Sequence, residues 1–482
     1  MRISRKFRLD ATQYQLDFVD IDSRRDLPVF LDPYFLSVQT DQWSFEATRT
    51  IRSFFEHFVR LVRADDLAGA RELFSYLGEP NETCLGLSKG PPEGRGIGPV
   101  NADDMFESLL KSKAIQTGAV EHLEDARIFV DGIGRDKTSD MTTNIIRRHL
   151  LEYTRQQAVL WGIPLQAGVP SGDYWSSKER RWMADFTDRL IVSGKPLLLV
   201  PKAVVSADDR YTPQQYHSHH VLEYLKNEHM SMNSALVQRY RRKDGTERAF
   251  VTKKDLEEQV APLSKAYLLK FTQDHPEIFG EFREQIRSKM QRMVNENLTF
   301  DPLPVVTEQL ITRLRAIPSG GERATEYHRT VAGILELIFY PDLFAPQLEH
   351  EIHEGRKRID LTLDNGARDG FFHRLHSVLK IPCAYILVEC KNYSRDVANP
   401  ELDQMSGRFS PNRGKFGIVV SRTVDDMPLL LARCADSHRD DRGTILPLAD
   451  ADLITILEAL GAGAVRPEQE LLQDRLRAIV LV

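Results

Sequence analysis

Two carboxylates and one lysine stand at the polar ends of two short hydrophobic runs in the last third of the chain. In the run 358–363, apolar and polar residues alternate, which puts Asp360 on the polar face of a predicted strand. The run 384–391 is apolar enough to be a strand buried on both faces, and its period of two puts Glu389 and Lys391 side by side. If the two strands are neighbours in one sheet, the three side chains converge on a site for a hard divalent cation.

Hydrolysis of a phosphodiester bond needs this combination of residue types. The reaction must bring an attacking water to a phosphate and neutralise the negative charge that builds on the phosphate oxygens. Asp360 and Glu389 would hold Mg²⁺, with Mn²⁺ able to substitute, and the ion would keep several of its own waters. Lys391 would orient the nucleophilic water, help to deprotonate it, or contact the scissile phosphate. The alternative interpretation is that all three are surface charges at strand ends.

These residues resemble the motif of the PD-(D/E)XK, or restriction-endonuclease-like, nucleases, and within them the Mrr-like branch. Asp360 corresponds to the lone acid of that motif, and Glu389-Cys390-Lys391 corresponds to its acid-x-lysine element. Gln404 follows a short predicted helix later, at a place where Mrr-like members often carry a glutamine. The resemblance therefore implies that Asp360, Glu389, Lys391 and Gln404 belong to one catalytic site.

The resemblance covers residues 322–460 and departs from the family pattern in two places. Ile359 stands where the family motif has a proline before its first acid. The segment 364–380 is longer than a tight hairpin loop, and its Phe371 and Phe372 predict a helical turn that packs on the sheet. The fold that the resemblance implies is an α/β/α sandwich, and the implied activity is Mg²⁺-dependent cleavage of DNA.

The elements predicted around the two strands follow the order that such a sandwich requires. A helix over 322–339 precedes them, and in the resembled family a helix at this place often adds a glutamate to the metal site. Glu326 is the better candidate for that glutamate and Glu336 the second, while a solvated helix charge is the alternative for Glu326. After the second strand, the sequence predicts a helix at 401–409, a strand at 415–421, a helix at 427–435, a strand at 444–446 and a helix at 451–460.

Positive charge around the predicted site would suit a polyanionic substrate. Gln404 and Arg408 lie one turn apart on the predicted helix, so both could face the same phosphate. The further cationic candidates near the site are Arg395, Arg413, Lys415 and Arg422. A charged face that is merely solvated would explain the same residues.

Composition limits the class of protein more than it identifies a function. The 482 residues predict two to three domains, and a net charge of −6 means that any affinity for nucleic acid must come from local patches. The four cysteines are scattered without a C-x-x-C pair, which predicts reduced core residues in a cytoplasmic protein. No stretch reaches the length of a membrane span, and the N-terminus lacks the apolar region of a signal peptide.

Domain boundaries are predicted from proline and glycine clusters and from the extent of the resemblance. Residues 1–310 are expected to form a larger mixed α/β region for recognition or regulation, with a break near 89–100 between two subdomains. A linker is expected at 311–321, followed by the nuclease domain at 322–462 and a C-terminal tail at 463–482. The glycine-rich cluster near residue 90 lacks the lysine of a P-loop, so it predicts an ordinary exposed loop.

Two further patterns in the N-terminal region leave alternatives open. Acids between 131 and 140 and a predicted strand at 195–202 that ends in lysine repeat part of the C-terminal motif. They fit a degenerate nuclease-like module or a second metal site, or simply a helix cap at Ser139 or Asp140 with acids in turns. The basic stretch 239–254, with Tyr240 among arginines, suits contact with a nucleic-acid backbone and equally suits a solvated hairpin.

The sequence therefore predicts a Mg²⁺-dependent DNA endonuclease in the C-terminal third, with an N-terminal region that recognises a target or binds a regulatory protein or ligand. Family analogy alone suggests bacterial defence against foreign DNA as the setting. Cutting both strands with one site per chain predicts a homo-oligomer. Two alternatives remain open: a catalytically silent nuclease-like module for binding or assembly, and a nuclease of DNA repair or recombination. The residues do not discriminate between DNA and RNA as the substrate.

Overall fold

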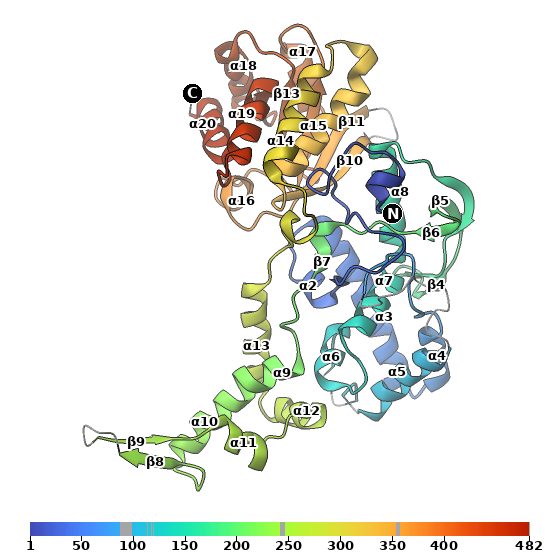
Figure 1. Ribbon diagram of the computed structural model, residues 1–482, viewed down its shortest axis with the longest axis vertical. Helices are drawn as coiled ribbons and strands as arrows, with labels where there is room; N and C mark the ends of the chain where they lie inside the picture. Colours follow the sequence, from blue (N-terminus) through green and yellow to red (C-terminus); the bar gives the residue numbers. More distant parts are fainter. Residues whose placement is uncertain are drawn as a thin grey trace.

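The structure is a computed structural model that describes residues 1–86, 99–112, 114–116, 118, 120–241, 246–352 and 357–481. It has three parts (Figure 1): a C-terminal part built on a five-stranded sheet, an N-terminal body over residues 1–212, and an arm over residues 213–289 that projects from the body. The expected fold class, mixed α/β, is confirmed. The break expected near 89–100 lies almost wholly outside the described residues.

The C-terminal sheet has the strand order β10-β11-β12-β13-β14. β11 pairs antiparallel with both β10 and β12, whereas β13 pairs parallel with both β12 and β14. The strand bounds are β10 Leu343–Ile352, β11 Lys357–Asn365, β12 Tyr385–Lys391, β13 Phe416–Ser421 and β14 Thr444–Ala449. The four strands predicted from the sequence are confirmed, whereas β10 was not predicted because its alternation of apolar and polar residues is irregular.

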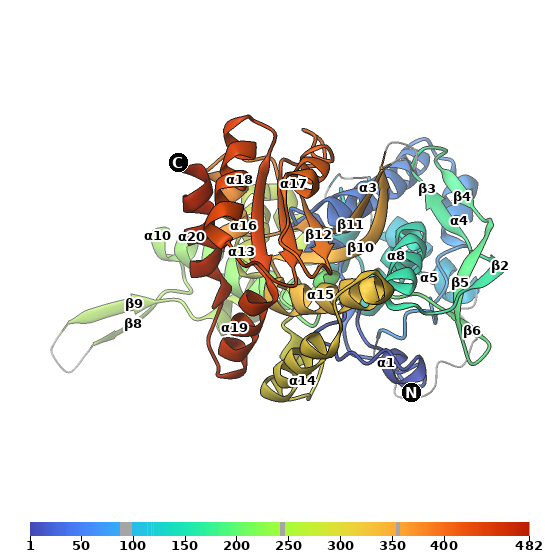
Figure 2. The ribbon, with the colours of Figure 1, turned by 90° about the horizontal axis from the view of Figure 1, so that it is seen from above.

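Helices cover both faces of this sheet, as Figure 2 shows from above. Their bounds are α14 Leu303–Ala316, α15 Ala324–Phe339, α16 Gly370–Ser377, α17 Asn399–Ser406, α18 Met427–Arg439, α19 Asp450–Gly461 and α20 Glu468–Val480. α15 and α19 lie on one face, and α17 and α18 lie on the other (Figure 2). Leu361 and Leu363 of β11 join the core on the α15 side, whereas Ile359 packs in the cluster on the α17 side. The alternation of apolar and polar residues in this strand predicted that all three would lie on one face.

The expected linker and the expected tail are both helices that pack on the sheet domain. α14 occupies the range 311–316 of the linker, and its buried Leu310, Ile311 and Leu314 face α19 and α15. α20 occupies most of the tail and buries Leu472 and Ile479 against α18 and β14. Helices with an apolar stripe bury it against a neighbour, so helices that pack on the sheet extend from residue 303 to residue 480.

The N-terminal body is mainly helical. Its helices are α1 Ile3–Lys6, α2 Pro33–Ser37, α3 Gln42–Arg63, α4 Leu67–Phe74, α5 Pro99–Lys111, α6 Ala126–Phe129, α7 Arg135–Ile145 and α8 Arg147–Trp161. Its short strands are β1 Phe30–Leu31, β2 Gln166–Pro170, β3 Tyr174–Ser176, β4 Arg181–Met183, β5 Phe186–Val192, β6 Lys195–Leu197 and β7 Val205–Ser206. The apolar stripe of α3, including Phe54, Phe55 and Phe58, is buried in the core.

Two details of this body differ from the sequence prediction. The predicted strand 195–202 ends at Leu197, after which the buried chain is irregular. Asp140 lies inside α7, whose N-cap is Gly134, so neither Asp140 nor its neighbour Ser139 caps this helix.

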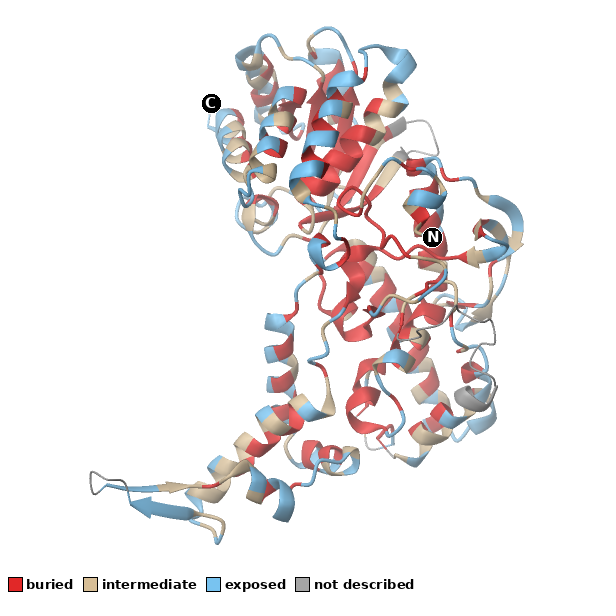
Figure 3. Cartoon of the chain, in the orientation of Figure 1, coloured by how far each residue is buried: buried red, intermediate tan, exposed pale blue. Residues whose placement is uncertain are grey.

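The arm consists of α9 Pro213–Tyr216, α10 Leu222–Ser231, β8 Gln238–Arg241, β9 Glu247–Phe250, α11 Lys253–Gln259, α12 Lys265–Asp274 and α13 Pro276–Lys289. The hairpin of β8 and β9 forms its far end (Figure 1). Figure 3 shows that buried residues concentrate in the body and the sheet domain, whereas the hairpin is largely exposed. Within the described ranges, every helix is too short or too polar to span a lipid bilayer.

The N-terminal body and the sheet domain share one hydrophobic core. Buried polar contacts cross the same boundary: Lys202 Nζ lies 3.0 Å from Glu336 Oε1 of α15. The backbone N–H of Ala345 in β10 donates to Asp17 Oδ1 over 2.9 Å. Because these groups are buried, the body holds the sheet domain in a fixed position at its β10 edge. The four cysteines are also buried, as predicted, and none forms a disulfide.

Candidate active site

The register between β11 and β12 brings the first predicted acid beside the second. Leu361 lies opposite Val388 in this antiparallel pair, so the next step along the two strands juxtaposes Asp360 and Glu389. Asp360 Oδ2 accepts a hydrogen bond from the backbone N–H of Cys390 over 3.0 Å. The carboxylate of Asp360 thus takes the position of a backbone acceptor where β11 stops pairing with β12.

Glu389 and Lys391 share one face of β12, as their period of two predicted. Lys391 Nζ donates to Glu389 Oε2 over 3.1 Å. Glu389 is 1% exposed and Lys391 7% exposed, whereas Asp360 is half-buried. The pair is therefore not a set of solvated surface charges, because burying a charge without a partner or a ligand is costly.

A second cation reaches the same carboxylate. Arg408 follows the end of α17, is buried, and forms an ion pair with Glu389 through Nη1. Burial lowers the pKa of the Arg408 guanidinium, and the negative charge of Asp360 partly offsets that effect. Glu389 therefore has a cation at each of its two oxygens, and Asp360 contributes negative charge from the neighbouring strand.

The structure does not bring Glu326 or Gln404 to this site. Glu326 lies in the first turn of α15 and pairs with Arg323, 3.0 Å from its Nε, beside a groove that α14 and the N-terminal segment form. Gln404 is exposed on α17. Glu336, the second candidate on α15, is buried at the other end of that helix against Lys202. Helical periodicity places a residue on a face of its helix, but the ion-pair partners of Glu326 and Glu336 are residues outside the site, and Gln404 is exposed.

The other predicted cations are held by local partners. Arg395 pairs with Glu401 at 2.8 Å, and Lys415 pairs with Asp441 at 2.8 Å. Arg413 donates to the backbone carbonyl of Arg408, and Arg422 pairs with Asp450 at 3.2 Å. Among these predicted cations, only Arg408 contacts one of the site carboxylates.

Sequence reasoning missed three contacts that shape the site. Arg408 was expected on the same helix as Gln404, but α17 ends at Ser406, so the chain turns and directs Arg408 inward. His328 of α15 contacts the carbonyl of Cys390 at 3.2 Å. Asn392 donates to the carbonyls of Pro318 and Gly320, which fixes the loop before α15 beside the end of β12. An arginine just past a helix end was the only signal of these contacts in the sequence.

Two carboxylates with different surroundings suit a hard cation that keeps several waters. Mg²⁺ is commonly bound through one or two carboxylates and retains water at its other positions. Asp360 and Glu389 are the two carboxylates at the ends of adjacent strands that would supply such ligands. Across the described ranges, no group of three His, Cys, Asp or Glu side chains stands close enough to hold a metal ion, so Glu326 adds no third ligand.

The N-terminal acids do not reproduce this arrangement. Burial and the negative charges of Asp136 and Glu79 raise the pKa of Asp140 to about 8. Lys202, the lysine of the repeated pattern, pairs instead with Glu336 of the sheet domain. The second metal site considered from the sequence therefore lacks Lys202. Among the described residues of this region, no three His, Cys, Asp or Glu side chains lie close enough together to hold a metal ion.

Comparison with known proteins gives one match, in the N-terminal body. Residues 8–212 match the family model described as "Domain of unknown function (DUF8370)". No curated protein and no solved structure matches the chain. The match ends at the residue before α9, where the arm begins, and it does not include the candidate site.

Proposed function

We propose that the C-terminal part is a metal-dependent DNA endonuclease whose site consists of Asp360, Glu389 and Lys391. One observation carries the proposal: the first acid accepts a hydrogen bond from the residue between the other two, and the lysine contacts the second acid. Glu389 and Lys391 are buried, Asp360 is half-buried, and the three residues stand at the polar ends of adjacent strands. A lysine and two acids with this arrangement have a direct use in phosphodiester hydrolysis.

The order of elements around the site supports the same proposal. A helix, three antiparallel strands, a helix and a parallel strand follow one another as α15, β10–β12, α17 and β13. Helices lie on both faces of this sheet. This is the arrangement expected for a restriction-endonuclease-like sandwich, whose acids stand on the central strands. β14 with α18 and α19 extends the sheet beyond that unit.

Each side chain has a role in this proposal that follows from its surroundings. A bound Mg²⁺ would supply a Lewis acid and an activated water, and Asp360 and Glu389 are the residues that would hold it. Lys391 is buried beside Glu389, where its ammonium can hold a water or a phosphate oxygen by hydrogen bonds. Arg408 presents a planar guanidinium whose donors fit phosphate geometry.

The binding-module alternative is favoured by one specific observation. Glu389 already has two cationic partners, Lys391 and Arg408, and a third acid is not within reach among the described residues. A silent nuclease-like domain could use such an ion-pair network purely for stability. Metal binding discriminates between the two, because a stable network without a ligand role would bind no cation.

The first experiment incubates supercoiled and linear DNA with the full chain in Mg²⁺, Mn²⁺ or EDTA. We expect metal-dependent nicking that Lys391→Ala and Asp360→Asn abolish and that the exposed Gln404→Ala does not change. If the wild-type protein cuts neither DNA and calorimetry detects no Mn²⁺ binding, the enzyme proposal is wrong. If it binds Mn²⁺ and cuts only RNA, the site stands and the DNA assignment is wrong.

Two wider parts of the proposal have separate tests. Defence against foreign DNA rests on family analogy, and protection of bacteria from phage that depends on Lys391 would support it.

Cutting both strands calls for a dimer when each chain has one site. Light scattering of the purified chain measures the oligomeric state, and a monomer that cuts both strands together would contradict that expectation.

A further inference from the structure

The hairpin at the end of the arm has no buried face. In β8, Gln238, Arg239, Tyr240 and Arg241 are all exposed, and the β9 residues are exposed or half-buried. The hairpin projects away from the body, with neither of its faces covered (Figures 1 and 3). An isolated two-stranded hairpin is marginally stable in water, so a bare ribbon of this kind is typical of a surface that a partner completes.

The register distributes basic and aromatic side chains over both faces of this ribbon. Tyr240 lies opposite Arg248, and Tyr240 also meets Phe250 edge to face, with 5.6 Å between ring centroids. Arg239 and Arg241 point to the opposite face, because successive residues of a strand alternate. Each face therefore carries arginine, and one face adds an aromatic ring.

The charge of this region contrasts with the charge of the chain. From residue 238 to residue 254 the sequence has seven lysines and arginines and two acids, whereas the whole chain has a net charge of −6. Lys253 pairs with Glu223 at 2.9 Å and Lys254 approaches Glu258 at 3.8 Å, so the lysines next to the ribbon face the arm's own acids. The two ribbon strands carry three arginines, Arg239, Arg241 and Arg248, against one acid, Glu247, which lies opposite Arg241.

The base of the arm is anchored firmly to the N-terminal body. Arg283 of α13 pairs with Asp125 at 2.6 Å and with Glu124 at 3.2 Å, both buried acids of the body. The ring of Tyr211, at the end of the body, stacks on Phe282 of α13, with 5.3 Å between ring centroids. The arm is therefore held by buried ionic and aromatic contacts and not by a plain loop.

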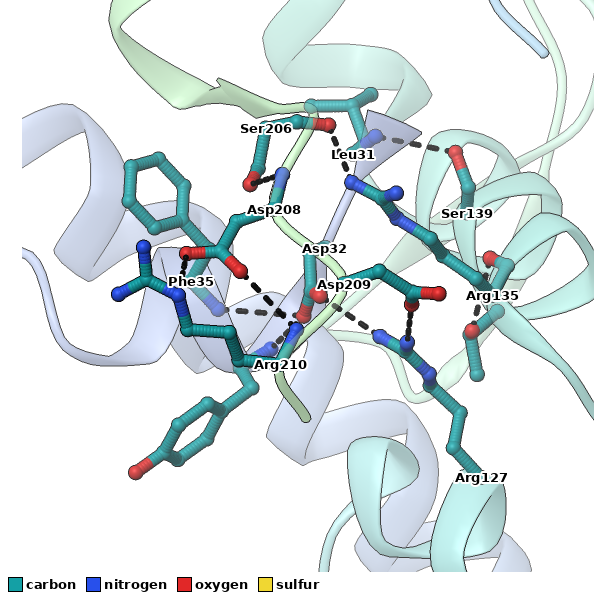
Figure 4. Close-up of polar contacts among 12 residues, drawn as sticks. Leu31, Asp32, Phe35, Arg127, Arg135, Ser139, Ser206, Asp208, Asp209 and Arg210 are labelled. Carbon is teal, nitrogen blue, oxygen red and sulfur yellow. Dashed lines mark hydrogen bonds and ion pairs between the residues drawn. The ribbon is translucent and has the colours of Figure 1, made fainter. Parts of the chain in front are cut away.

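Figure 4 shows a second set of contacts just before the arm begins. Arg127 donates to Asp32 Oδ2 over 2.7 Å and to Asp209 Oδ1 over 3.1 Å. Arg135 donates to the carbonyl of Ser206 over 2.7 Å. Asp32 is itself the N-cap of α2, so these arginines tie the chain that leads into the arm to a fixed helix end. These contacts fix the segment from which the chain enters the arm.

We propose that the β8–β9 ribbon is a duplex DNA-binding element that enters a groove of the double helix. The major groove admits a two-stranded ribbon, and arginines on both faces can reach the phosphates on either side while one arginine faces the base edges. Tyr240 adds a ring that packs against the sugar-phosphate backbone. The inference rests on the proposed nuclease function for its choice of duplex DNA, but the binding itself needs no cleavage.

The test measures binding by fluorescence anisotropy in EDTA, on the full chain with Lys391→Ala so that no DNA is cut. The ribbon variant is Arg239→Gln/Arg241→Gln/Arg248→Gln. The matched control is Arg52→Gln/Arg60→Gln/Arg63→Gln, which removes the same charge from the exposed surface of α3. For a duplex of about three helical turns, we expect the ribbon variant to bind roughly 30-fold more weakly or worse, with the slope of log K against log salt reduced by about 2 to 3.

Each outcome of this experiment tests DNA binding by the β8–β9 ribbon independently of the proposed nuclease activity. Equal losses in the ribbon and control variants would mean a general charge effect and would overturn the ribbon assignment. If the ribbon variant no longer bound single-stranded RNA but still bound duplex DNA as tightly as the parent, the choice of duplex DNA as the partner would be wrong. Because all six arginines are exposed or lie at the surface, thermal unfolding of both variants should match the parent. If the wild-type protein does not cleave DNA but binds it in a way that depends on the ribbon arginines, only the nuclease proposal is contradicted.

Discussion

Arg408 forms an ion pair with Glu389, so a guanidinium lies where a divalent cation would have to bind. Lys391 takes the other oxygen of the same carboxylate, 3.1 Å away. A cation that binds Glu389 therefore competes with a buried arginine. This relationship makes Arg408 the residue whose substitution best separates a metal site from a purely structural ion-pair network.

Arg408→Gln should tighten Mn²⁺ binding, because it removes the competing charge and leaves Glu389 with Lys391 alone. We expect an affinity about 5-fold higher or more, measured by calorimetry, since coupling between two ligands of one group is commonly of that size. Arg442→Gln is the control, because Arg442 pairs with the exposed Asp403 and not with the site. Weaker Mn²⁺ binding in Arg408→Gln would contradict the competition.

Asp360 has a structural role that can be separated from its chemical one. Asp360→Asn keeps an acceptor for the Cys390 N–H, whereas Asp360→Ala leaves that backbone group without its partner. We expect the alanine variant to lose about 1 kcal/mol of unfolding free energy and the asparagine variant to lose clearly less. Both variants should lose Mn²⁺ binding. Urea denaturation and a metal titration on the same two proteins provide the measurements.

Glu326→Gln and Gln404→Ala should leave cleavage within about twofold of wild type, as is usual for surface substitutions. Glu326 pairs with Arg323 on α15, and Gln404 is exposed on α17, so neither contacts the site. Initial rates of plasmid nicking at saturating Mg²⁺ measure the effect, with Glu389→Gln as the inactive reference. A loss as large as that of Glu389→Gln would place the substituted residue in the working site.

The buried pair of Lys202 and Glu336 should show a large penalty when only one member is removed. Lys202→Met leaves the carboxyl of Glu336 buried without its cation and should cost about 1 to 3 kcal/mol of unfolding free energy at neutral pH, because the carboxyl remains protonated there. Burial raises the pKa of Glu336 to about 8 even with the lysine present. The double variant with Glu336→Leu should recover much of the loss. Additive losses in the two single variants would contradict a direct pairing.

Asp140 should make stability fall as pH rises. Burial raises its folded-state pKa to about 8, whereas an unfolded chain releases this proton near pH 4. The contribution is therefore full below about pH 4 and is lost as the pH rises toward 8. Asp140→Asn should match wild type at about pH 4 and be more stable at about pH 8, by ~1 kcal/mol or more. Melting temperatures of both proteins across this range measure the difference, and parallel curves would contradict the prediction.

Local patterns in the sequence predicted most elements of the sheet domain. The alternation before Asp360 and the apolar run that ends at Lys391 identified β11 and β12, because burial of a strand face leaves a period of two in the sequence. The short helix in the long loop between them was predicted from its paired phenylalanines, and α16 confirms it. The helices α14 and α20 in the expected linker and tail were not predicted, since their apolar stripes have meaning only once a partner helix is present.

The sequence by itself determined which residues share a strand face, and hence that Glu389 and Lys391 stand side by side. Tertiary structure decided the rest of the site: the strand register that brings Asp360 to Cys390, and the turn after α17 that sends Arg408 inward. It also decided that Glu326 and Gln404 stay outside. The physical reason is the separation along the chain of the residues that determine each feature. Strand and helix periods come from the chain's own geometry, whereas register, ion pairs and burial depend on residues that only packing brings together.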